Sequence, residues 1–103
     1  MGYDRKKLGE ILDSIPIGKV TTHGLIAKYL GTTSRAVARG VCASKGVGRL
    51  KVVMKGGYFP HPDNYEDCSD RARTLIAEGL EISNDKRRVV ISEENLWKPY
   101  LLT

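Results

Sequence analysis

The sequence has few cysteines and no long apolar run, and both shortages exclude classes of protein. Cys42 and Cys68 are the two cysteines, and they lie far apart with no C-x-x-C spacing, so a reducing compartment is expected rather than a disulfide scaffold. No stretch approaches the roughly 18 apolar residues of a transmembrane helix. The charged N-terminus lacks the apolar region of a secretory signal. We therefore expect a cytoplasmic protein, nucleoid-associated if the source is a prokaryote, with no membrane contact.

Candidate metal ligands are also scarce. His23 and His61 add to the two cysteines, but none of the four has a partner at the spacing that metal sites use. His61 lies between two prolines, where a solvated loop residue is expected. We expect neither a metal nor a cofactor.

Length and charge favour one domain that binds a polyanion. The chain has 103 residues, 41% apolar and 28% charged, which is the composition of an ordinary globular protein. Residues 1–103 are therefore expected to form a single monomeric domain. Seventeen Lys and Arg against twelve Asp and Glu give a formal charge of +5, and such an excess favours nucleic acid as the partner.

Apolar periodicity predicts a mostly helical α+β domain with short β-hairpins. The expected helices span 4–14, 23–30 and 35–44, and a fourth begins at a Ser69 cap and ends near Gly79. Short strands are expected at 20–22 and 50–54, a hairpin at 80–91, and a loop at 60–67. A closing turn should place Trp97 and Tyr100 against the core.

The second and third expected helices have the form of a (winged) helix-turn-helix, because only three residues separate them. Cations in the third helix bracket small residues, which would let its backbone approach another surface while the cations reach phosphates. The cations are Arg35, Arg39 and Lys45, and the small residues are Ala36, Ala38, Gly40, Ala43 and Ser44. The same small residues could instead pack against a neighbouring helix. Cys42 is expected to pack inward.

Several segments match the motifs of one known family. The letters IPIGKVTTHG match a P-x-G-x-V-(T/S)-(T/S)-Y-G segment, and RAV matches the start of an R-A-V-G segment that opens a recognition helix. RLKVVMKGG follows at the expected distance, and TLIAEGLEI is similar to a closing L-L-x-x-E-G-V. Most of the chain thus resembles the DNA-binding domain of the 6-O-alkylguanine-DNA alkyltransferases. Its length and the late Leu96-Trp97 are similar to the shorter alkyltransferase-like proteins.

The chain departs from this family at the alkyl-accepting motif. The family's enzymes have P-C-H-R-V-V, in which a thiolate activated by the His accepts the alkyl group. Gly48 to Val53 match this segment and place Arg49 at the cysteine and Leu50 at the histidine. Alkyltransferase-like proteins typically have Trp before the His, and the chain departs from that pattern too. The resemblance therefore implies a protein that is not an enzyme.

The resemblance also implies a DNA-binding surface and a lesion pocket. Arg35 matches the arginine that enters the base stack in place of an extruded nucleotide, and His23 stands where the family has a Tyr that rotates a phosphate. The implied contacts to the minor groove of duplex DNA are Thr21, Thr22, His23, Arg35, Ala36, Arg39, Ser44 and Lys45. The implied pocket consists of His23, Arg49, Leu50, Lys51, Val53 and His61. Arg49 could donate to a base edge or could close the pocket.

Three functions stay open at this point. The leading hypothesis is non-enzymatic binding of double-stranded DNA that detects alkylated guanine or another modified base by extrusion and flags it for downstream repair proteins. The second is a general helix-turn-helix nucleic-acid-binding module, such as a regulator or an accessory domain of a repair nuclease, with the pocket filled by Arg49 and Leu50. The third is an enzyme with a site rebuilt from Cys68, His61 and Asp63.

Overall fold

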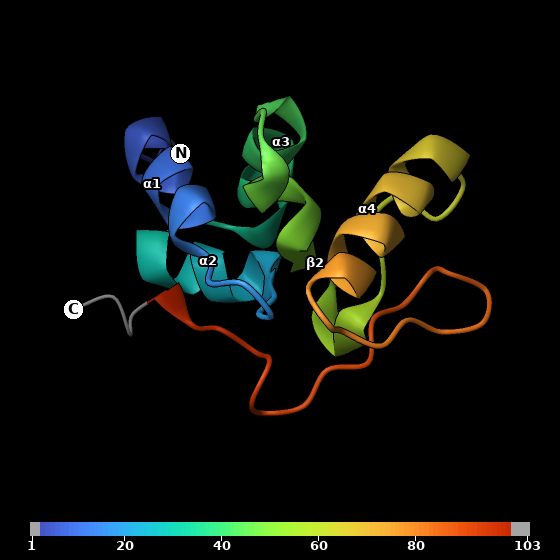
Figure 1. Cartoon of the computed structure of the whole chain (residues 1–103). Helices are drawn as coiled ribbons and strands as arrows, with labels where there is room; N and C mark the ends of the chain where they lie inside the picture. The colour runs from blue at the N-terminus through green and yellow to red at the C-terminus, as the bar shows by residue number, and fades with distance from the viewer. Residues whose placement is uncertain (1–2, 100–103) are drawn as a thin grey trace.

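Four α-helices and a two-stranded parallel sheet make up the fold in a computed structural model that describes residues 3–99 (Figure 1). Helices α1, α2 and α3 lie together, α4 lies on the other side of β2, and the segment after α4 runs back towards α2 (Figure 1). The mostly helical α+β class is confirmed. The elements are α1 (Arg5–Ser14), β1 (Thr21–Thr22), α2 (His23–Leu30), α3 (Ser34–Ala43), the 3-10 helix η1 (Val47–Lys51), β2 (Val52–Val53), η2 (Lys55–Gly57) and α4 (Tyr65–Ala77).

The first three helices begin within a residue of the predicted positions because the sequence supplies good caps. The side chains of Asp4, Thr22 and Thr33 each accept a hydrogen bond from a backbone N–H of the first turn that follows. Gly31 ends α2 in the left-handed conformation, with a φ of 73°, which glycine adopts without strain. The turn to α3 is therefore as short as the sequence predicts.

The predicted start of α4 is wrong. The helix begins at Tyr65 rather than after Ser69, because Asn64 caps it by accepting the N–H of Asp67 at 2.9 Å. Glu66 and Asp67 in the first turn favour this earlier start, since carboxylates stabilise the positive end of a helix dipole. Only residues 60–64 of the predicted loop are thus outside the helix.

The strands are shorter than predicted. Strand β1 pairs with β2 in parallel, with Thr21 opposite Val52 and Thr22 opposite Val53. The hairpin expected over 80–91 is reduced to one antiparallel bridge, between Ile82 and Val89, although 2.8 Å backbone hydrogen bonds flank it. A wing of full strands is therefore not formed in the described part of the chain.

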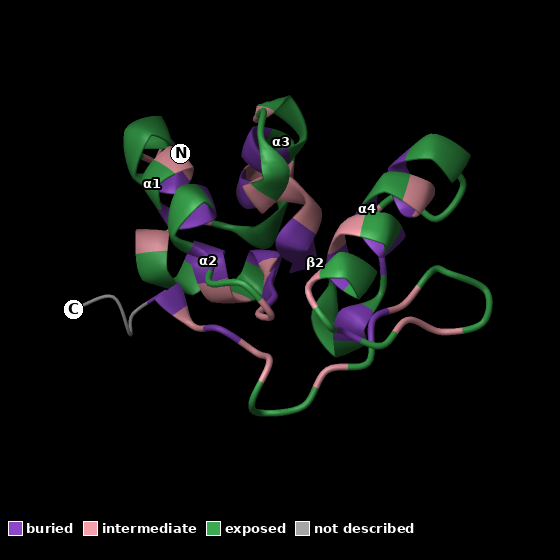
Figure 2. Ribbon diagram, viewed as in Figure 1, coloured by how far each residue is buried: buried purple, intermediate pink, exposed green. Residues whose placement is uncertain are grey.

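Buried residues form two clusters, and β2 contributes one residue to each. Figure 2 marks the buried positions along the ribbon. Val52 joins the cluster of α1, α2 and α3, and Val53 joins the cluster under α4, because successive strand residues point to opposite faces. Trp97, 7% exposed, closes the first cluster as predicted, and its backbone N–H donates to the carbonyl of Val20 at 2.7 Å. Tyr100, predicted to pack beside it, lies outside the described residues.

The small residues of α3 serve two surfaces. Gly40 is buried under α1, where a Cβ atom would overlap the side chains of Tyr3 and Leu8. Tyr3 also donates a hydrogen bond to the carbonyl of Ala36 at 3.2 Å. Ala38, in contrast, faces the cavity described below. Close packing between helices thus explains Gly40. The hypothesis that small residues let α3 approach another surface closely still applies to the other small residues.

Candidate nucleic-acid interface

A cavity of about 950 Å³ lies against the helix-turn-helix. Its wall takes residues from the start of α2, from α3, from η1 and η2, and from the segments around His61 and Arg88. The ionisable groups on this wall are cations, histidines and one thiol: Arg35, Arg49, Lys55, Arg71, Arg88, His23, His61 and Cys42. Among the described residues, no Asp or Glu lines the cavity. The fold therefore presents a concave surface on which positive charge is in excess, as a site for a polyanion requires.

Five residues predicted for the site are brought together on this wall: Thr22, His23, Arg35, Arg49 and His61. They come from α2 and its cap, α3, η1 and the loop before α4, so the fold gathers segments that are far apart in sequence. Arg35 is exposed near the start of α3, and His61 is exposed in its loop as predicted. The cluster is thus accessible from solvent at both of these residues.

The structure places three predicted pocket residues elsewhere. Val53 is fully buried in the second core cluster, and Leu50 is half-buried in η1 without lining the cavity. Lys51 is 3% exposed, and its ammonium group donates to the carbonyls of Ile15 and Pro16 and pairs with Glu78. The 3-10 turn of η1 presents Arg49 to the cavity and turns its neighbours inward, which the motif alignment could not predict.

The residues predicted to contact DNA also fall into two groups, because some are buried or half-buried and others are exposed. Thr21 is fully buried in the sheet, so its side chain cannot reach a phosphate, and that prediction is corrected. Ser44 is half-buried, and its hydroxyl donates to the carbonyl of Gly40 at 2.7 Å. Arg39 and Lys45 are exposed on and just after α3, outside the cavity wall, and Ala36 is half-buried on the same helix. Both cations remain available to an external partner.

The two thiols differ in exposure. Cys42 was expected to pack inward but is exposed on the cavity wall, because Val37 and Val41 already fill the inner face of α3. Cys68 is buried in α4, and its thiol donates to the carbonyl of His61 at 3.3 Å. Burial, together with the charge of Asp67, raises the pKa of the Cys68 thiol. Cys68 is therefore a poor nucleophile at neutral pH.

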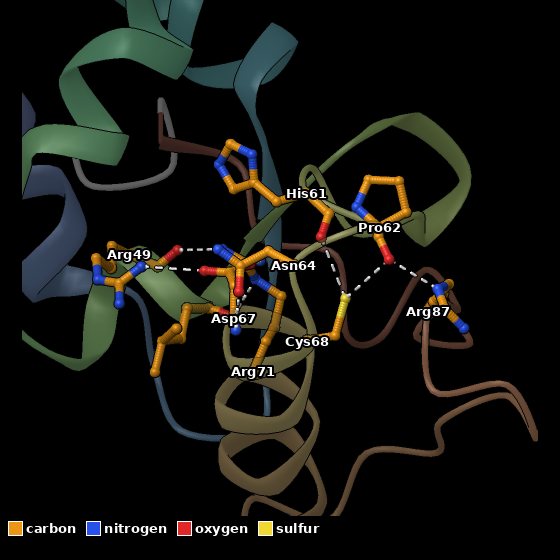
Figure 3. A network of polar contacts seen from close by, with 9 residues as sticks. Arg49, His61, Pro62, Asn64, Asp67, Cys68, Arg71 and Arg87 are labelled. Carbon is orange, nitrogen blue, oxygen red and sulfur yellow. Dashed lines mark hydrogen bonds and ion pairs between the residues drawn. The ribbon is translucent and has the colours of Figure 1, made fainter.

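A buried arginine network behind the cavity was missed by the sequence analysis (Figure 3). Arg71 of α4 is 2% exposed and pairs with Asp67, one turn earlier. Its guanidinium also donates to the carbonyls of Leu50 at 3.2 Å and Arg49 at 3.3 Å. Asp67 accepts a longer contact, 3.4 Å, from Arg49. The network thus fixes the backbone that carries Arg49 at the cavity.

A sequence signal for this network exists. Arg71 occupies a position of the apolar stripe of α4, together with Cys68, Ala72 and Leu75, at the spacing of one helix face. An arginine on a buried face requires a partner, and Asp67 four residues earlier is the nearest candidate on the same helix. Burial lowers the pKa of Arg71, and the charge of Asp67 opposes this shift.

His23 is neutral at physiological pH. It is 8% exposed at the start of α2. Burial, followed by electrostatic interactions with Arg71 and His61, lowers its pKa from 6.5 to about 4. The imidazole therefore contributes hydrogen-bonding capacity to the cavity without adding a further charge.

Acidification is expected to destabilise the protein through His23. The unfolded chain binds a proton on this residue near pH 6.5, whereas the folded chain binds it near pH 4, so the free energy of unfolding falls as the pH drops between these values. The expected loss from His23 is up to about 3 kcal/mol at pH 4. Urea unfolding of wild type and His23→Gln at pH 7 and pH 4 measures it. His61→Gln, at an exposed loop position, is the control. An equal pH dependence in wild type and His23→Gln would contradict the assignment.

Two solved structures of S. pombe proteins have the same fold as this chain. One is Atl1 in complex with damaged DNA containing O6-carboxymethylguanine, with 25% sequence identity, 95% of this chain and 100% of that chain covered, and a TM-score of 0.73. This chain has the fold of the alkyltransferase-like protein Atl1. A second match is to S. pombe ATL in complex with DNA, with 22% identity, the same coverage and a TM-score of 0.69. The resemblance to alkyltransferase-like proteins is thus confirmed at the level of structure.

The similarity to Atl1 has no counterpart among family models or curated proteins. No protein-family model and no curated protein matches the sequence. Within residues 3–99, no helix is long and apolar enough to cross a membrane, and no three His, Cys, Asp or Glu residues gather as a metal site would require. The likeness to Atl1 therefore supplies the fold and a DNA-binding precedent, and the roles of individual residues rest on the geometry above.

Proposed function

We propose that the protein binds duplex DNA without catalysing a reaction, and that it recognises alkylated guanine or another modified base by receiving the extruded nucleotide in its cavity. The observation that carries this proposal is a cavity on a helix-turn-helix whose described wall holds five Lys and Arg side chains and no carboxylate. The S. pombe Atl1 structure, which holds damaged DNA, supports the same function. Bound lesions would be flagged for repair proteins that act downstream.

The proposed docking element is α3, in the minor groove. Arg35 is exposed at the start of this helix, at the edge of the cavity, and Arg39 is exposed one turn later. Ala38 between them has a short side chain, so the helix backbone can approach DNA closely. In this arrangement Arg35 fills the space of the extruded nucleotide, while Arg39 and Lys45 neutralise phosphates.

The proposed function does not include transfer of an alkyl group to the protein. Arg49 stands at the acceptor position, and a guanidinium stays protonated and is not a nucleophile. Cys68 is buried with a raised pKa, which weakens the case for a rebuilt site with His61 and Asp63. The intact mass of the protein is therefore expected to stay unchanged after incubation with a duplex that contains O6-methylguanine.

One observation favours the second candidate, a general nucleic-acid-binding module. Arg49 occupies part of the cavity wall and contacts Asp67, so its side chain could fill the space that a base would need. Such a module would use the same cations for DNA but would show no preference for a lesion. Binding to damaged and undamaged duplexes separates the two candidates.

Replacing Arg35 with alanine is expected to weaken binding to a lesion duplex about ten-fold more than binding to the undamaged duplex of the same sequence. Extrusion of a base costs a few kcal/mol, and the inserted side chain offsets part of this cost only when the base leaves the stack. Fluorescence anisotropy titrations at one salt concentration measure both affinities. A fluorescent base analogue beside the lesion should brighten with wild type and much less with Arg35→Ala.

Arg39→Ala is the matched control on the same helix. The variant is expected to weaken binding to both duplexes by the same factor. It should also reduce the slope of log affinity against log salt concentration by about 1, as the loss of a phosphate contact does. If wild type binds the two duplexes equally, and Arg35→Ala also loses affinity equally for both, lesion recognition is wrong and the general module is the better description.

A further inference from the structure

We propose that the cavity selects modified bases whose added group carries a negative charge, and that Arg49 makes this selection. The inference rests on the proposed function, because it concerns which bases the cavity accepts. It goes further by assigning a chemical class to the adduct and a specificity-determining residue to this chain. The argument depends on the charge balance of the network behind the cavity (Figure 3).

Asp67 cannot neutralise both arginines that contact it. Arg71 forms the closer ion pair with Asp67, is 2% exposed, and directs two further donors at backbone carbonyls. Arg49 has one contact to Asp67, at 3.4 Å, and its side chain is 31% exposed. One carboxylate thus faces two guanidinium groups, and the excess positive charge lies on the more exposed Arg49.

The rest of the wall does not supply the missing negative charge. Lys55 and Arg88 add further cations, and no described carboxylate lines the cavity. Arg88 donates to the carbonyl of Gly56 at 3.0 Å and lies over the ring of Tyr58 at 5.4 Å, so neither contact neutralises it. An occupant that carries a negative charge would therefore improve the charge balance of the cavity.

The chemistry of a guanidinium favours such an occupant. A neutral alkyl group placed against Arg49 removes water from the charge and offers no replacement hydrogen bond. A carboxylate accepts two parallel hydrogen bonds from the planar guanidinium, which adds geometric specificity to the attraction. Asp67 holds Arg49 only by a long contact, so the free donors of Arg49 remain available to the adduct.

The test compares three duplexes of one sequence: undamaged, with O6-carboxymethylguanine, and with O6-carbamoylmethylguanine. The two adducts have nearly the same shape and differ in charge. Wild type is expected to bind the carboxymethyl duplex about ten-fold tighter than the carbamoylmethyl duplex, a difference of about 1.4 kcal/mol. Arg49→Gln should bring the two affinities within about two-fold, while Arg49→Lys, which keeps the charge, should restore part of the difference.

Arg39→Gln is the matched control, because Arg39 is exposed outside the cavity wall. Arg39→Gln should weaken binding to all three duplexes by the same factor, so the ratios between the three affinities stay unchanged. Far-UV circular dichroism and the affinity for undamaged DNA check that the Arg49 variants fold.

Each outcome decides a different statement. If wild type prefers both adducts equally over undamaged DNA, charge selection is wrong and the proposed function stands. If Arg49→Gln keeps the ten-fold preference, another cation makes the selection and the role of Arg49 is overturned. If wild type prefers neither adduct, the proposed function fails and this inference fails with it.

Discussion

Replacing Glu78 with alanine is expected to lower the free energy of unfolding by about 3–5 kcal/mol, because the change leaves the ammonium group of Lys51 buried without its carboxylate. The side chain of Lys51 is 4% exposed, that of Glu78 is 14% exposed, and the two charged groups are 2.9 Å apart. Glu78 also accepts the backbone N–H of Gly18 at 2.8 Å. The carboxylate thus connects the end of α4 to the turn after α1, and its loss affects both segments.

Two variants make this prediction specific. Glu81→Ala removes a carboxylate three residues away at an exposed position, and it should cost less than about 1 kcal/mol. The double variant Lys51→Met with Glu78→Gln removes both charges and keeps an acceptor for Gly18, so it should recover part of the loss. The recovery stays incomplete because the carbonyls of Ile15 and Pro16 lose the donor that Lys51 supplies. Chemical denaturation at pH 7 measures the free energy of unfolding of wild type and of each variant. An effect of Glu78→Ala no larger than that of Glu81→Ala would show that the buried pair is not important for stability.

The helical part of the fold could be predicted because its signals are local. Asp4, Thr22 and Thr33 cap helices that the apolar periodicity already indicates, and Gly31 ends α2 in the conformation that glycine favours. The start of α4 was missed since Asn64 and Ser69 are both acceptable caps, and local sequence does not rank them. The parallel pairing of β1 with β2 depends on contacts between distant segments, which periodicity does not contain.

The candidate site, like the fold, was predicted in part from motifs and depends in part on contacts between distant segments. Thr22, His23, Arg35, Arg49 and His61 were predicted from motifs and do meet at the cavity. Lys51 and Val53 were predicted there because they lie in the segment that matches the alkyl-accepting motif, but the 3-10 turn and the strand direct them into the interior. Lys55 lies in the matched segment RLKVVMKGG but was not predicted for the site, and Arg71 and Arg88 lie outside every matched segment; all three line the cavity.

Asp67 links the stability of α4 to the shape of the cavity. It pairs with the buried Arg71, and Arg71 in turn donates to the carbonyls of Arg49 and Leu50. The guanidinium of Arg71 also lies 5.7 Å from the centre of the Phe59 ring, in the second core cluster. The position of Arg49 therefore depends on a carboxylate that does not itself line the cavity.

Asp67→Ala is accordingly expected to lower the free energy of unfolding by about 3–5 kcal/mol, since it leaves a guanidinium that is 2% exposed without a counter-charge. Asp70→Ala is the matched control, because Asp70 lies on the same helix and pairs with Arg73 at 3.4 Å, but with side chains 50% and 75% exposed. An exposed pair of this kind contributes less than about 1 kcal/mol. Urea unfolding at pH 7 compares the two variants with wild type. Equal losses would mean that Arg71 finds sufficient compensation in the carbonyls of η1, and that Asp67 does not hold the cavity wall in place.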